Sequence, residues 1–113
     1  MALDFGAIDT MQAGLTFHRE RQEVLASNIA NLDTPGYRPQ DLDRTIDAKT
    51  NATDPDSIRT FDDGGQLQGP DGNAVSLERE LAKMDANRAS YATTAELVSR
   101  RFALLKYAAG DGS

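Results

Sequence analysis

Cysteine and tryptophan are both absent from this chain of 113 residues. Without thiols the chain has no disulfides, thiolate metal sites or cysteine nucleophiles. Four phenylalanines and three tyrosines supply its aromatic side chains. A chain this short holds one domain at most, and with so few large side chains its core is predicted to be thin.

Positive charge is also scarce, with 12 basic residues against 18 acidic ones and a net charge of -6. Phosphate binding needs a basic surface, so we predict no nucleic-acid partner. No apolar run approaches the roughly 20 residues that span a bilayer, which predicts no direct membrane insertion. Asp4 stands where a secretory signal carries basic residues, and we therefore expect no cleaved signal peptide.

Two terminal segments have apolar residues every three or four positions, the spacing of one helix face. The first helix should end near residues 31–33 because Pro35 disfavours helical geometry before it, while Ser76 caps the second and Gly110 ends it. The residues predicted to pack between the helices are Ile8, Met11, Leu15, Leu25, Leu81, Met84, Tyr91, Val98, Phe102 and Leu105, with His18, Gln22 and Arg88 at polar positions of the same faces.

The middle of the chain has a different composition. Residues 38–75 contain eight aspartates and four basic residues, and their large apolar side chains are sparse. Such a segment does not bury enough apolar surface to offset its ordering entropy. We expect it to be flexible in the free chain and to form a short β-hairpin around residues 61–75 on assembly.

The predicted fold is therefore mainly α, with two long terminal helices packed as an antiparallel, coiled-coil-like hairpin. Residues 1–37 hold the first helix and its terminal turn, residues 38–75 the acidic connector, and residues 76–113 the second helix with a short tail. A second apolar stripe at heptad spacing has no partner in such a hairpin: Phe17, Val24, Leu97 and Leu104. It indicates either self- or hetero-assembly or scattered apolar surface residues, which are common.

The end of the first helix carries the most specific motif. Asn31 can end the helix in a left-handed conformation or bond its last carbonyl groups, and Asn28 offers an amide to a neighbour's backbone. Pro35 and Gly36 suit the centre of a tight turn, after which Tyr37 packs back with its polar tip. Residue by residue, this describes a capped helix terminus followed by a turn.

In combination, these residues resemble the signature of the flagellar rod and hook protein family. The residues that carry it are Asn28, Ile29, Ala30, Asn31, Thr34, Pro35, Gly36 and Tyr37. The second helix is similar to that of the proximal rod proteins of the FlgB type, in the segments 77–84 and 100–108 and at Tyr91. The resemblance covers about residues 5–37 and 75–109 and leaves the connector unmatched.

This resemblance implies a structural subunit of the proximal rod of the bacterial flagellar basal body, with no enzymatic activity and no cofactor. It implies self-assembly through the terminal helices into a tubular drive shaft, in the service of motility. The implied partners are other rod subunits, the ring-to-rod junction protein, copies of the same chain and the flagellar type III export apparatus. The implied location is the periplasmic rod, reached without a cleaved signal peptide.

Three other functions are weighed against this one. His18, the sole histidine, lies on the helix seam without clustered carboxylates, which favours a polar core residue over a general base. The connector aspartates lack the spacing of a calcium-binding loop and read as a solvated linker, so no metal site is predicted. A helical-hairpin adaptor or export chaperone shares the helix pattern, and the signature motif is the one feature that argues against it.

Overall fold

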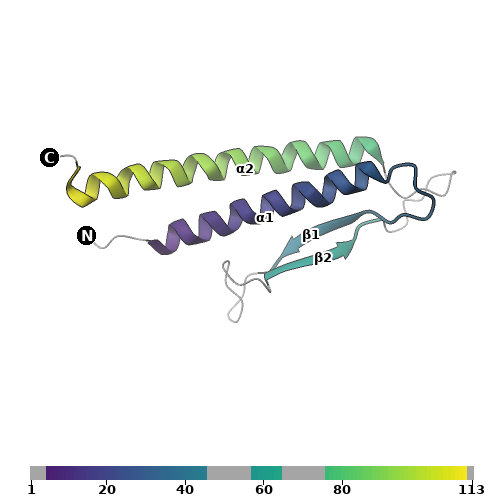
Figure 1. Cartoon of the computed structure of the whole chain (residues 1–113), viewed down its shortest axis with the longest axis horizontal. Helices are drawn as coiled ribbons and strands as arrows, with labels where there is room; N and C mark the ends of the chain where they lie inside the picture. Colours follow the sequence, from purple (N-terminus) through teal and green to yellow (C-terminus); the bar gives the residue numbers. More distant parts are fainter. Residues whose placement is uncertain (1–4, 46–56, 65–75, 112–113) are drawn as a thin grey trace.

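The computed structural model describes residues 5–45, 57–64 and 76–111, and all structural statements below concern these residues. Two long helices, α1 (Phe5–Ala30) and α2 (Leu77–Lys106), run antiparallel and pack against each other, as Figure 1 shows. A small sheet of β1 (Gln40–Arg44) and β2 (Ile58–Asp62) lies beside them. The predicted mainly helical fold with a paired helical hairpin is confirmed.

Helix α1 ends where the sequence predicts. Its last residue is Ala30, and the backbone N–H of Asn31 still donates to the carbonyl groups of Ser27 (3.1 Å) and Asn28 (3.2 Å). The chain leaves the helix over the next three residues, before Pro35, because a residue that precedes proline avoids helical geometry.

Helix α2 begins and ends with the predicted caps. Ser76 is extended (φ -108°, ψ 117°), and its hydroxyl accepts a bond from the N–H of Arg79 (3.4 Å). Acidic side chains occupy the first turn and Lys106 the last, as the helix dipole favours. The helix runs on through one wider turn (Tyr107–Asp111), in which Gly110 has a φ of 98°.

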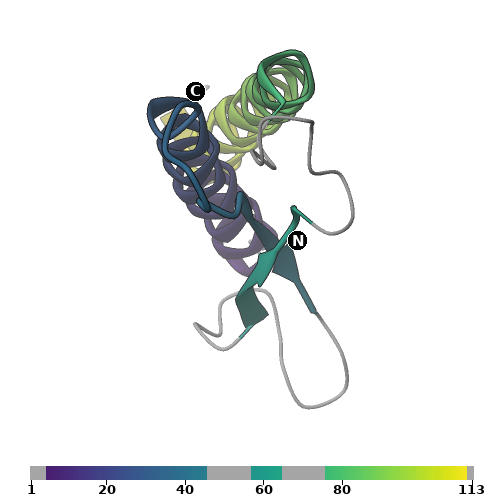
Figure 2. The same cartoon turned by 90° about the vertical axis from the view of Figure 1, so that its right-hand side faces the viewer.

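The β-hairpin lies earlier in the connector than predicted. Strands β1 and β2 pair antiparallel, from Gln40 opposite Asp62 to Arg44 opposite Ile58. The prediction of a hairpin around residues 61–75 is thus wrong in position, and residues 65–75 lie outside the described residues. Strand β1 lies near the start of the connector because it packs on α1. The composition of the connector does not reveal this contact. Figure 2 shows the sheet as a second layer beside the two helices.

The buried interior is small and partly polar. The molecule extends 66 Å along its longest axis and 15 Å along its shortest. Five apolar side chains among the described residues are buried: Ile8, Leu25, Pro39, Leu42 and Val98. Polar or charged residues are buried beside them: Asn28, Asp41, Ser57, Glu80 and Asn87. Since buried polar groups require partners, their hydrogen bonds decide how the helices and the sheet fit together.

Candidate assembly site at the helix–hairpin junction

Asn28, in the last full turn of α1, has a completely buried side chain. Its Nδ2 donates to the backbone carbonyl of Gln40 (2.7 Å) and to Oε2 of Glu80 (3.0 Å). Its Oδ1 accepts from the backbone N–H of Gln40 (3.0 Å) and from the hydroxyl of Tyr37 (3.1 Å). One amide thereby joins the end of α1, the start of β1 and the first turn of α2.

The turn after α1 delivers Tyr37 to this amide. The N–H of Tyr37 donates to the carbonyl of Thr34 (3.2 Å), and Gly36 between them has a φ of 77°. A positive φ in the second central position is the geometry of a type II turn, which favours glycine. At the helix end, Nδ2 of Asn31 donates to the carbonyl of Ser27 (2.8 Å), so Asn31 caps by bonding the last carbonyl groups.

The structure corrects one part of the motif's interpretation. Both donor bonds of Asn28 are made within the chain, so the prediction that its amide serves a neighbour's backbone is wrong. The reason is that β1 packs along α1, which places the backbone of Gln40 in the same chain beside the amide. Of the remaining signature residues, Ile29 is half-buried and three lie exposed at the surface: Ala30, Thr34 and Pro35.

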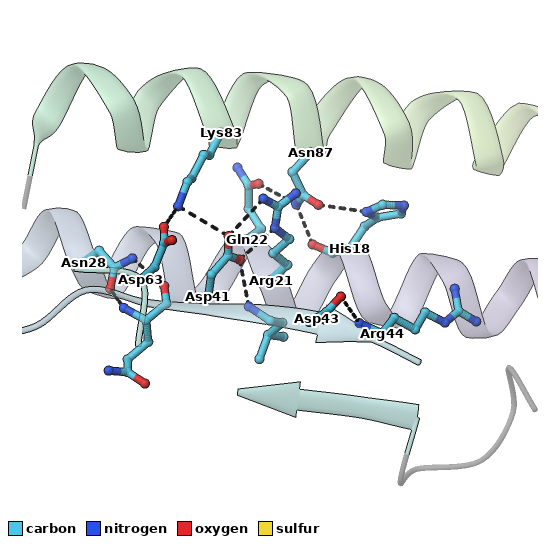
Figure 3. Close-up of polar contacts among 12 residues, drawn as sticks. His18, Arg21, Gln22, Asn28, Asp41, Asp43, Arg44, Asp63, Lys83 and Asn87 are labelled. Atoms are coloured by element: carbon cyan, nitrogen blue, oxygen red, sulfur yellow. Dashed lines mark hydrogen bonds and ion pairs between the residues drawn. The ribbon is translucent and has the colours of Figure 1, made fainter. Parts of the chain in front are cut away.

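A cluster of charged side chains fastens the hairpin to both helices. Arg21 of α1 holds Asp41 of β1 through two bonds, Nε–Oδ1 at 2.8 Å and NH2–Oδ2 at 3.1 Å. Lys83 of α2 reaches the same carboxylate (3.4 Å) and also pairs with Asp63, just after β2. Arg79 donates to Oδ1 (3.0 Å) and to the backbone carbonyl (3.2 Å) of Asp63. Both strands are therefore anchored by carboxylates between helical cations (Figure 3).

The electrostatics of Asp41 follow from this arrangement. Burial by itself would raise the pKa of the carboxyl group. The hydrogen bond from Arg21, the N–H of Leu42 (2.7 Å) and the charges of Arg21 and Lys83 together bring that pKa below its ordinary value. The hydrogen bond to Asp41 in turn raises the pKa of Arg21. Asp41 is thus held as a carboxylate.

A second polar contact lies in the middle of the helix pair. Nδ2 of Asn87 donates to the backbone carbonyl of His18 (2.6 Å) and to Oε1 of Gln22 (2.8 Å). Its Oδ1 therefore faces Nδ1 of His18 at 2.8 Å, and the imidazole donates through Nδ1. The partner of His18 is Asn87, and the adjacent Arg88 is exposed. A polar pair at this depth fixes the helix register.

The comparisons with known proteins agree with this geometry. The family model for the flagella basal body rod protein matches residues 8–38, which span α1 and the signature turn. A flagellar basal body rod protein FlgB of Aquifex aeolicus is 34% identical over 100 residues, covering 79% of this chain and 81% of that protein. The chain belongs to the FlgB family. The FlgB of Aeromonas hydrophila is 29% identical over 98% of this chain and 99% of its own.

Similarity within the FlgB family is highest in a short region. The FlgB of Escherichia coli is 49% identical over 43 residues, 38% of this chain and 31% of that protein. Membership makes this chain a flagellar basal body rod protein with a structural role, and the resemblance drawn from the motif is confirmed.

The predicted packing residues of this FlgB-family chain fall into three groups. Ile8, Leu25 and Val98 are buried, and a second set is half-buried: Met11, Leu15, Met84 and Leu105. Leu81, Tyr91 and Phe102 are 47%, 41% and 48% exposed, so their placement between the two helices is wrong for the single chain. The buried positions of α2 are occupied by Glu80, Asn87 and Val98. Two of these three residues are polar, whereas the apolar pattern predicts apolar side chains there.

The second apolar stripe divides between the two helices. On α1, Phe17 is half-buried, with the guanidinium of Arg44 5.8 Å from its ring centre, and Val24 is half-buried. Phe17 therefore has an intrachain partner that a hairpin of helices alone does not supply. On α2, Leu97 and Leu104 are 44% and 64% exposed.

Sequence reasoning missed the charged cluster. Asp41 and Asp63 were assigned to a solvated linker because the composition of the connector is acidic throughout. The available signal was the pair of cations beside seam positions, Arg21 next to Gln22 and Lys83 next to Met84. Within residues 5–45, 57–64 and 76–111, no three His, Asp or Glu side chains are grouped to hold a metal ion.

Proposed function

We propose that this chain is a structural subunit of the proximal rod and that its terminal helices assemble into the tubular drive shaft of the flagellum. Its neighbours are other rod subunits, the ring-to-rod junction protein and copies of the same chain. The subunit reaches the periplasmic rod through the flagellar export apparatus without cleavage of a signal peptide. FlgB family membership supports the rod, and the exposed end of α2 supports assembly through helices.

The exposed end of α2 is the observation that carries this proposal. Four large side chains there have little cover: Leu97, Phe102, Leu104 and Tyr107, with exposed fractions from 44% to 73%. Figure 1 shows α2 extending past the first residue of α1, so α1 does not cover this end. Large apolar residues gathered at one end of an elongated chain indicate a surface that another protein covers.

The proposed location in the periplasmic rod requires no membrane-spanning helix. Across the ranges that the structure describes, neither α1 nor α2 combines the length and apolar character of a membrane-crossing helix. A subunit of this kind joins the rod through protein contacts. The wide separation between the exposed end of α2 and the signature turn, at opposite ends of the helix pair in Figure 1, allows contacts above and below.

The test is a Phe102→Asp substitution in the chromosomal gene, read out by swimming and by electron microscopy of basal bodies. Because Phe102 is 48% exposed, the folded chain should persist while an unpaired charge blocks the contact. We expect non-motile cells whose basal bodies have rings and no complete rod.

Two further variants serve as comparisons, one as a control for exposed phenylalanine and one for loss of folding. Phe61→Asp, at a 42% exposed phenylalanine of β2, is the matched control and should leave rods intact. Val98→Asp should fail differently, by unfolding, because Val98 is 8% exposed and packs inside the chain. Complete rods in the Phe102→Asp strain, or a chain confined to the cytoplasm, would favour an adaptor or export chaperone instead.

A further inference from the structure

A groove of about 210 Å³ runs between the helices at their midpoint. Its walls come from His18, Arg19 and Gln22 of α1 and from Asn87, Arg88 and Tyr91 of α2. At the groove, Nδ2 of Asn87 already donates both of its hydrogens to groups of α1, the carbonyl of His18 and Oε1 of Gln22. Arg19 and Arg88 remain for a charged ligand, beside the amide of Gln22 and the hydroxyl of Tyr91.

Apart from Arg101, only the two arginines at the groove form neither an ion pair nor a ring contact among the described residues. Arg21, Arg38, Arg59, Arg79 and Arg100 each pair with a carboxylate, and Arg44 lies over Phe17. Arg19 and Arg88 are exposed, face the same groove from opposite helices, and have no carboxylate within 4 Å in the described part of the chain. In a chain with a net charge of -6, two unpaired cations at one groove select for an acidic ligand.

The same chain carries an acidic face of matching size. Glu78 and Asp85 lie seven residues apart on α2, which places them on one side of the helix at a separation of about 10 Å. Both are exposed and neither forms an ion pair within the described residues. Leu81 lies between them and is 47% exposed, so the face offers two carboxylates flanking an apolar side chain.

The two features fit each other. Packed helices have axes about 8–10 Å apart, so Arg19 and Arg88 project from backbones whose separation is close to the spacing of the two acidic residues along α2. We propose that the groove at Arg19 and Arg88 receives the Glu78–Leu81–Asp85 face of α2 from a second copy of this chain. Leu81 then lies against Tyr91, and each carboxylate meets one arginine.

The contact joins two different surfaces of the same chain. Such a heterologous contact repeats from copy to copy and generates a ring or a helical array, which is the symmetry that a tubular rod requires. The inference rests on the proposed function, in which copies of the chain pack together. It adds which side chains make the contact between copies.

The test uses reciprocal charge reversal in the purified chain, followed by sedimentation velocity. Arg19→Glu with Arg88→Glu reverses the groove, and Glu78→Arg with Asp85→Arg reverses the face. Each variant alone should associate about tenfold more weakly than the wild type, because groove and face then carry the same sign. Their mixture should recover association, because each groove again meets a face of opposite sign. Arg59→Glu, at an exposed arginine of β2 outside the groove and away from the exposed end of α2, should leave association unchanged.

Each remaining outcome overturns the proposal. Unchanged association of both reversed variants removes the groove from the contact. Weakening without recovery in the mixture means that the groove contacts a surface of the second copy other than the Glu78–Leu81–Asp85 face. A wild-type chain that stays monomeric at about 1 mM, where even a millimolar contact is half formed, excludes a contact between copies. Basal bodies separate the two proposals, since rods that form with the reversed groove and fail with Phe102→Asp leave the rod function standing.

Discussion

Removal of the Asn28 amide should destabilise the chain more than any other single change in the signature. Its side chain is fully buried and bonds Gln40 twice, Glu80 once and Tyr37 once. In Asn28→Ala the backbone groups of Gln40 lose these partners, and the carboxyl group of Glu80, which is 1% exposed, loses a donor. A buried polar group left without a partner costs about 1–3 kcal/mol.

These costs do not add fully because the groups share one site and can relax together. We therefore expect Asn28→Ala to lower the free energy of unfolding by about 3–4 kcal/mol, a large part of the 5–15 kcal/mol typical of a domain. Asn28→Asp should be worse than Asn28→Ala. The aspartate keeps the acceptor for Tyr37 but puts a second carboxylate 3 Å from Glu80 in place of a donor.

Urea unfolding followed by circular dichroism measures these differences. Asn31→Ala is the matched control, since the side chain of Asn31 donates to the carbonyl of Ser27 and accepts from the hydroxyl of Thr34 (3.3 Å), both at the surface. It should cost about 1 kcal/mol, because water can reach the groups that lose these partners. A loss below 1 kcal/mol for Asn28→Ala, or a milder effect of Asn28→Asp, would refute the view that this amide joins three elements.

Further predictions concern the turn and the charged cluster. Gly36→Val should lower the free energy of unfolding by about 1–2 kcal/mol through backbone strain alone, because φ is 77° and nothing lies within 4 Å of an added Cβ. Gly36→Asn should cost less in the same urea titration, since asparagine tolerates this conformation. The lowered pKa of Asp41 contributes stability above the ordinary carboxyl pKa near 4, which is lost as the pH falls through the lower folded value. Asp41→Asn should therefore lower the free energy of unfolding by about 1.5–3 kcal/mol at neutral pH. It should also make the free energy of unfolding fall less steeply as the pH becomes acidic, which defines the acid limb of the pH profile. An equally steep acid limb in Asp41→Asn would assign that limb to other carboxyl groups.

The two helices, their caps and the turn could all be predicted from local sequence. These features depend on neighbours in the chain: Ser76 caps α2 through a residue three positions on, and Gly36 provides the one backbone angle the turn needs. The family signature is also local, because it occupies one helix end and one turn. Local interactions and short motifs can be predicted without knowledge of the fold.

The helix faces were only half predictable. The apolar period gave the inward positions Ile8, Leu25 and Val98 correctly, since apolar burial dominates there. It placed Leu81 inward as well, whereas Glu80 occupies the buried position. A hydrophobic pattern does not foresee this, because a glutamate is buried only when a distant residue, here Asn28, supplies its hydrogen bond.

The path of the acidic connector could not be predicted from its composition. Asp41 and Asp63 look like any other aspartates of a solvated segment until Arg21, Arg79 and Lys83 converge on them from two helices. The groove at Arg19 and Arg88 likewise exists only once the two helices lie in register, with His18 against Asn87, 69 residues away in sequence. Charge and burial act through space, and the partners that fix a polar side chain lie far away along the chain.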